Sequence, residues 1–145
     1  GRTISGNACH SFAGNPETVV YKMQDGALGV KKCKYASELP KGVKWAIGGM
    51  GLLNMYNPEE EGFIGKFADV HRKTNHNVLG VKNGMVYGVY YKNMNTNQIN
   101  EHCKNKMKFD MAVLLDGGGL AAMNGTERFA QINTGCKQGY AIQFV

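Results

Sequence analysis

Short runs of alternating apolar and polar residues, separated by glycine-containing turns, make up much of this chain. Two such pairs of runs, in residues 19–32 and 77–92, flank the dipeptides Asp25-Gly26 and Asn83-Gly84, which favour tight turns. We expect a β-hairpin at each. The last seven residues, GYAIQFV, alternate in the same way and predict a half-buried strand.

Two other stretches are apolar without alternation. Residues 111–115, MAVLL, predict a central strand that is covered on both faces. Residues 44–56, KWAIGGMGLLNMY, contain too many glycines for a stable helix, so we expect a buried strand that runs into a loop. The acidic segment 57–63, NPEEEGF, predicts an exposed loop.

One helix is well signalled within residues 94–107, MNTNQINEHCKNKM. Asn95 fits the N-cap, Gln98 the capping-box position, and Met94 with Ile99 a hydrophobic staple. The residues expected to face the core are Ile99, His102, Cys103 and Met107. His102 on this face is more often a packing residue than a ligand.

These elements together predict a single α+β domain over residues 1–145, built on a mainly antiparallel sheet with one or two helices. No apolar run is long enough to span a membrane, and the first ten residues lack the apolar core of a secretory signal. The four cysteines lack zinc-finger spacing, so buried thiols and disulfides both remain open.

The net charge of +6 favours an anionic partner such as a phosphate-bearing molecule. The basic residues are scattered, with no arginine-rich run and no nucleic-acid-binding motif, so a solvated surface explains them better than nucleic-acid binding.

The segment DGGG, residues 116–119, directly follows the expected central strand. Glycine has no side chain, so a ligand can approach the backbone N–H groups closely. The N–H groups of Gly117, Gly118 and Gly119 can therefore bind an anion. The residues that follow match neither a P-loop nor a dinucleotide-binding motif. A tight turn capped by Asp116 is an equally good interpretation of the residues alone.

A second constellation, ADVHRKTNHNVLG, spans residues 68–80. Arg72 could make a bidentate contact to phosphate, with Thr74 on the same side of an extended chain. His71 and His76 are candidate acids or bases near neutral pH. The alternative is a polar loop that leads into a strand.

Taken together, the Arg72 to Thr74 element, the Asn83-Gly84 hairpin, MNTNQI, LLDGGG and Asn124-Gly125 resemble the phosphodiester glycosidase domain family. This is the family of the lysosomal uncovering enzyme and of many bacterial and phage proteins. The segment from residue 6 to residue 29 resembles the family's opening, which brings Asn7 and His10 toward the site. The resemblance therefore covers nearly the whole chain and implies an extracytoplasmic location.

The resemblance implies hydrolysis of a sugar linked through its anomeric carbon to a phosphodiester. Asp116 is then the expected acid/base or electrostatic group, Arg72 the phosphate clamp, and the glycine amides the donors; His71, Thr74, His76 and Asn124 come second, and Asn7 and His10 third. No cofactor is required, although a divalent cation shared between Asp116 and phosphate is compatible. The expected partner is a phosphorylated glycoside or sugar-nucleotide-like molecule, and binding without cleavage is the alternative function.

Overall fold

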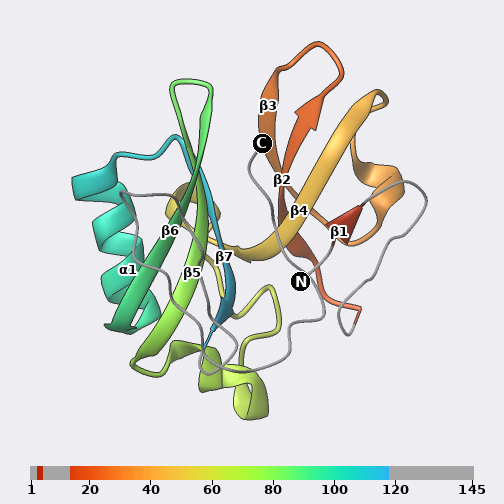
Figure 1. Cartoon of the computed structure of the whole chain (residues 1–145). Helices are drawn as coiled ribbons and strands as arrows, with labels where there is room; N and C mark the ends of the chain where they lie inside the picture. Colours follow the sequence, from red (N-terminus) through yellow and green to blue (C-terminus); the bar gives the residue numbers. More distant parts are fainter. Residues whose placement is uncertain (1–2, 5–13, 118–145) are drawn as a thin grey trace, which may run out of the picture.

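The fold, in a computed structural model that describes residues 3–4 and 14–117, is an antiparallel sheet with short helical segments (Figure 1). Six strands follow the order β3-β2-β4-β7-β5-β6, and β1 pairs with β4. The strands are β1 (Thr3–Ile4), β2 (Glu17–Met23), β3 (Leu28–Cys33), β4 (Val43–Gly51), β5 (Thr74–Lys82), β6 (Met85–Met94) and β7 (Met111–Gly117). The helical segments are η1 (Ala36–Glu38), η2 (Leu53–Met55), η3 (Gly65–His71), α1 (Thr96–His102) and the π-type turn η4 (Cys103–Met107). The α+β class expected from the sequence is confirmed.

Strand β4 joins two halves of the sheet. It pairs with β2 as far as Gly49, and its last two residues, Met50 and Gly51, then pair with β7 (Figure 1). A Cβ atom on Gly49 would collide with the carbonyl oxygen of Leu114, so a residue without a side chain is required where β4 approaches β7. The glycines that argued against a helix in this stretch therefore allow the crossing.

Both predicted hairpins are present. Asn83 and Gly84 both have positive φ, at 50° and 75°, and join β5 to β6 as a two-residue turn. At the β2–β3 connection only Gly26 of the Asp25-Gly26 pair has positive φ, and the Asp25 carboxylate accepts a hydrogen bond from the N–H of Ala27 at 2.9 Å. The β2–β3 turn, between Met23 and Leu28, is longer than the β5–β6 turn.

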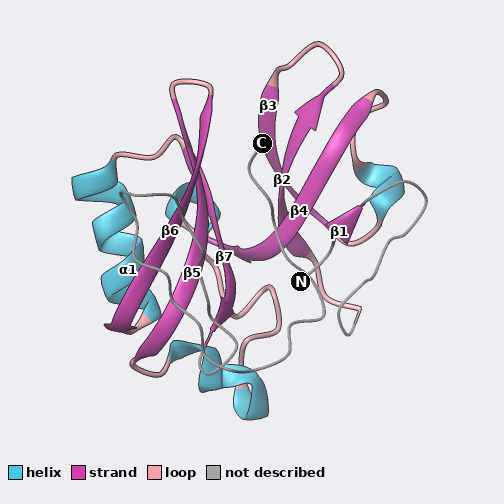
Figure 2. Ribbon diagram, in the orientation of Figure 1, coloured by secondary structure: helices cyan, strands magenta, loops and turns pink. Residues whose placement is uncertain are grey.

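The β7 strand is central and buried on both faces, as its continuous apolar pattern predicts. Ala112 and Leu114 pack in one cluster with Ile99 and Cys103 from the helical segment after β6. Val113, on the opposite face, packs with Val20 of β2 and with residues of β5. α1 therefore covers one face of the half of the sheet formed by β7, β5 and β6, and lies next to β6 in Figure 2.

The helix begins as the sequence predicts. Asn95 accepts a hydrogen bond from the N–H of Gln98 at 2.9 Å, and Gln98 Oε1 accepts one from the N–H of Asn95 at 3.0 Å. His102 contacts Tyr91: its Nδ1 lies 2.9 Å from the Tyr91 hydroxyl, and the two rings meet edge-on. No helix among the described residues is long and apolar enough to cross a membrane.

The prediction of an exposed loop at 57–63 is wrong for one residue. Glu61 is only 2% exposed, and its carboxylate accepts hydrogen bonds from the N–H groups of Thr18 at 2.6 Å and Gly51 at 2.9 Å. These donors lie on β2 and β4, so the loop is fastened to the sheet by a buried carboxylate. The predicted strand at 139–145 lies outside the described residues, as do Cys9 and Cys136, while Cys33 and Cys103 are buried thiols.

Candidate active site

Antiparallel pairing of β5 with β7 brings the two polar constellations of the sequence together. His76 of β5 lies opposite Gly117 of β7, and Val78 lies opposite Leu114. Between these pairs β7 contains one residue more than β5, so the ladder is irregular at Leu115 and Asp116. Such bulges re-aim side chains and are frequent beside active sites. The start of β5 and the end of β7 therefore define one candidate site at this end of the two strands.

His76 is a buried polar residue at this end of the two strands. Its side chain is 1% exposed, and its Nε2 lies 3.4 Å from the carbonyl oxygen of Arg72. Its Nδ1 has no hydrogen-bond partner among the described residues. Burial lowers the pKa of His76 below its ordinary value; the hydrogen bond to the Arg72 carbonyl opposes this shift, and the proximity of Arg72 and His71 adds to it. The lowered pKa favours the neutral imidazole, which can accept a hydrogen bond.

Arg72 directly follows η3 and remains at the surface. Its side chain is 53% exposed, and Nη1 forms an ion pair with Asp69 three residues earlier. Thr74, the first residue of β5, is half-buried and lies opposite Met94 of β6. Arg72 therefore precedes β5, and Thr74 and His76 are its first and third residues. The neighbouring strand, β7, carries Asp116.

His71, the last residue of η3, is tied to the start of α1. Its Nδ1 lies 2.6 Å from Oγ1 of Thr96, which is buried. Tyr56, which follows η2, contacts the same hydroxyl at 3.4 Å and donates a hydrogen bond to Asn97 Oδ1 at 2.6 Å. The contact of His71 with Thr96, and that of Thr96 with Tyr56, were missed from the sequence. The two residues of each contact are 25 or more positions apart in the chain, and no local pattern marks them.

The remaining candidates fall at or beyond the limits of the described chain. Asp116 and Gly117 are placed as part of the β7 backbone. The residues outside the described part are Asn7, His10, Gly118, Gly119 and Asn124. Among the described side chains, no group of three or more His, Cys, Asp or Glu residues is arranged to hold a metal ion.

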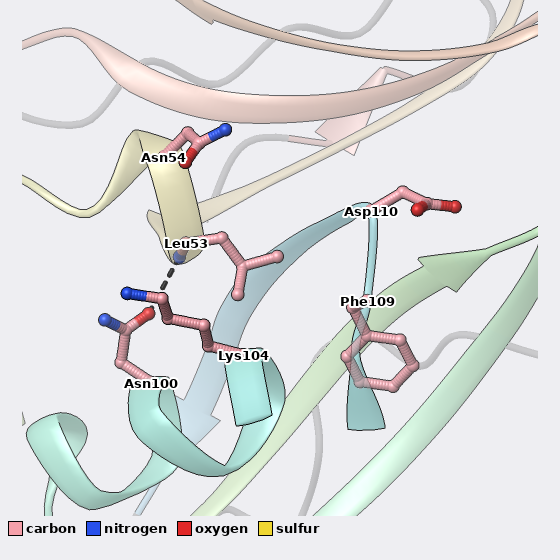
Figure 3. Close-up of a pocket in the computed structure, with 6 residues that line it drawn as sticks. All are labelled: Leu53, Asn54, Asn100, Lys104, Phe109 and Asp110. Atoms are coloured by element: carbon pink, nitrogen blue, oxygen red, sulfur yellow. Dashed lines mark hydrogen bonds between the residues drawn. The ribbon is translucent and has the colours of Figure 1, made fainter. Parts of the chain in front are cut away.

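A hollow of about 180 Å³ lies at the opposite end of β7, about 20 Å away by the length of a seven-residue strand. It is lined by Leu53, Asn54, Asn100, Lys104, Phe109 and Asp110 (Figure 3). Asn100 Oδ1 accepts a hydrogen bond from the N–H of Leu53 at 2.7 Å, which holds Leu53 at a φ of 59°. This hollow contains none of the residues expected to act in catalysis.

Comparison of the chain with protein-family models, with curated proteins and with solved structures finds no match.

Proposed function

We propose that this protein hydrolyses the bond between the anomeric carbon of a sugar and a phosphodiester, releasing the free sugar and a phosphomonoester. The observation that carries the proposal is the register of β5 with β7, in which His76 lies opposite Gly117. His76 ends the Arg72–His76 segment, and Gly117 is the first glycine of the DGGG segment. The proposal is supported by the resemblance of these two segments together to the phosphodiester glycosidase domain family.

The chemistry requires few groups. An ordinary glycosidase uses two carboxylic residues, one of which protonates the departing oxygen. A phosphodiester departs as a stable anion, so one carboxylate can suffice to stabilise the positive charge that develops at the anomeric carbon. Asp116 takes this role in the proposal, and the N–H groups of residues 117–119 receive the phosphate.

Arg72 supplies the cation for the phosphate. Its ion pair with Asp69 uses Nη1, and a guanidinium carries five N–H donors, so phosphate can be bound without breaking that pair. The exposure of the side chain leaves it free to reach a ligand. Thr74 adds a hydroxyl on the same strand. A divalent cation shared between Asp116 and the phosphate is compatible with this arrangement.

The test is incubation of the purified protein with a panel of sugar-1-phosphodiesters, including sugar nucleotides. Free sugar and phosphomonoester are measured by mass spectrometry, and thermal stability is recorded on the same samples. We expect product release that Asp116→Asn abolishes and Arg72→Ala weakens mainly through KM. Asp110→Asn is the matched control, because Asp110 adjoins the other end of β7 and an amide oxygen can still accept its hydrogen bond from the N–H of Asn83.

Each outcome has a separate meaning. Unchanged turnover in Asp116→Asn would remove Asp116 from the mechanism. Stabilisation by the ligands without release of sugar would replace hydrolysis with sequestration of a phosphorylated glycoside. The proposal would be contradicted if no member of the panel released sugar and none stabilised the protein.

A further inference from the structure

Four polar side chains from three separate segments form a hydrogen-bonded chain beside the start of β5. His71 Nδ1 lies 2.6 Å from Thr96 Oγ1, Thr96 Oγ1 lies 3.4 Å from the Tyr56 hydroxyl, and that hydroxyl donates to Asn97 Oδ1 at 2.6 Å. His71 comes from η3, Tyr56 follows η2, and the other two residues begin α1. None of these contacts is required by the sheet or by the helix cap.

The direction of each hydrogen bond follows from the number of protons available. Tyr56 has a single hydroxyl proton, which is committed to Asn97 Oδ1, so its oxygen can only accept from Thr96. The Thr96 hydroxyl proton therefore points toward Tyr56. With the Thr96 proton in that direction, the oxygen of Thr96 is the acceptor for His71, which then carries its proton on Nδ1.

Thr96, the central residue of these hydrogen bonds, is held in place by burial and by the capped start of α1. Thr96 is 1% exposed and directly follows Asn95, whose reciprocal hydrogen bonds with Gln98 fix the first turn of α1. His71 is half-buried, at the end of η3. Its imidazole is thus held by a buried hydroxyl through one nitrogen, which leaves Nε2 with an unshared electron pair.

We propose that Thr96 and Tyr56 are positioning residues that hold His71 as the Nδ1–H tautomer, so that its Nε2 accepts a proton from the attacking water. The inference rests on the proposed function. In the step, the oxygen of water bonds to the anomeric carbon while one of its protons passes to His71 Nε2. The bond from that carbon to the phosphate oxygen breaks, and its electron pair leaves with the phosphomonoester. The proton on His71 then returns to solvent.

The tautomer can be measured without turnover. Nitrogen-15 NMR of histidine-labelled protein, at a pH about two units above the ordinary histidine pKa of about 6.5, identifies which ring nitrogen carries the proton. We expect Nδ1–H for His71 in the wild type. In Thr96→Val the Nδ1–H would face a methyl group, so the proton should move to Nε2, where water can reach it. Thr96→Ser should restore Nδ1–H.

Tyr56→Phe makes a sharper test, because it leaves Thr96 in place. Without the Tyr56 oxygen, the Thr96 hydroxyl proton is free to turn toward His71 Nδ1, which would drive the His71 proton to Nε2. Tyr87→Phe, which removes a hydroxyl near the far end of β6, should leave the tautomer unchanged. A wild-type Nε2–H tautomer, or no change in Tyr56→Phe, would overturn the inference.

On a substrate identified from the panel, Thr96→Val should lower kcat roughly 10-fold to 100-fold with KM within about twofold, and Thr96→Ser should recover most of the loss. Equal kcat in Thr96→Val and wild type would also overturn the positioning role. If no panel member is hydrolysed, the proposed function fails, while the NMR result still decides how His71 is held.

Discussion

The strongest stability prediction concerns Glu61, whose carboxylate sits where β4 leaves β2 and turns toward β7. Its two donors, the N–H groups of Thr18 and Gly51, lie on the two strands at this junction. Gly51 is also one of the two β4 residues paired with β7. Replacing Glu61 with alanine removes the acceptor of both N–H groups at a site that is 2% exposed.

The magnitude follows from the two hydrogen bonds. Leaving a buried donor unsatisfied costs about 1–3 kcal/mol, so two give about 2–6 kcal/mol. Burial raises the pKa of Glu61, which means that burying its charge is itself unfavourable, and the lower half of that range is the better expectation. A domain of this size is stable by about 5–15 kcal/mol, so Glu61→Ala should remove a large share.

Urea unfolding followed through the fluorescence of Trp45 measures this loss, because Trp45 is the single tryptophan and lies on β4. The matched control is Glu60→Ala. Glu60 is the neighbouring residue, half-exposed, and forms a surface ion pair with Lys32 at 2.8 Å that should contribute at most about 1 kcal/mol. If Glu61→Ala costs no more than Glu60→Ala, the buried carboxylate does not hold the junction and the reasoning is refuted.

Three further predictions follow from the same structure. The pKa of Glu61 in the folded state is raised above its ordinary 4.5. The free energy of unfolding of wild type should therefore exceed that of Glu61→Gln most below about pH 4.5, and the difference should fall as pH rises through the raised pKa. Urea unfolding of both proteins across this pH range measures the difference. Asn95→Ala should cost about 1 kcal/mol by loss of the N-cap, whereas Asn105→Ala, past the end of α1, should cost less in the same assay. Gly80→Ala should cost about 1–3 kcal/mol, because the new Cβ would lie 2.5 Å from the ring of Phe109; a cost that Phe109→Leu does not reduce in a double-mutant cycle would contradict this cause.

Most of the sheet could be predicted from the sequence because its signals are local. The Asn83-Gly84 turn, the Asn95 cap and the continuous apolar run that becomes β7 each depend on residues a few positions apart. The strand order could not be predicted in the same way. Nothing within β4 indicates that its last two residues leave β2 for β7, because that pairing depends on segments more than 60 positions apart.

The candidate site divides along the same line. The sequence singled out the Arg72–His76 segment and the DGGG segment, and the described register of β5 with β7 brings their ends together. It did not reveal that His71 contacts Thr96 and that Thr96 contacts Tyr56, because the three residues come from separate segments. Nor did it reveal that Glu61 is buried, since three consecutive glutamates are typical of an exposed loop.

The position of β5 explains why a site at its start can be well ordered. β5 is paired on one side with β6 and on the other with β7, and three successive residues, Val78, Leu79 and Gly80, are buried. Pairing on both sides holds β5 in a defined register from Val78 onward, directly after the irregular pairing at His76. His76 therefore projects from an anchored strand, while Arg72 precedes it on exposed chain. In the proposed function, the buried imidazole of His76 would keep a fixed position, and the exposed guanidinium of Arg72 would bind the phosphate.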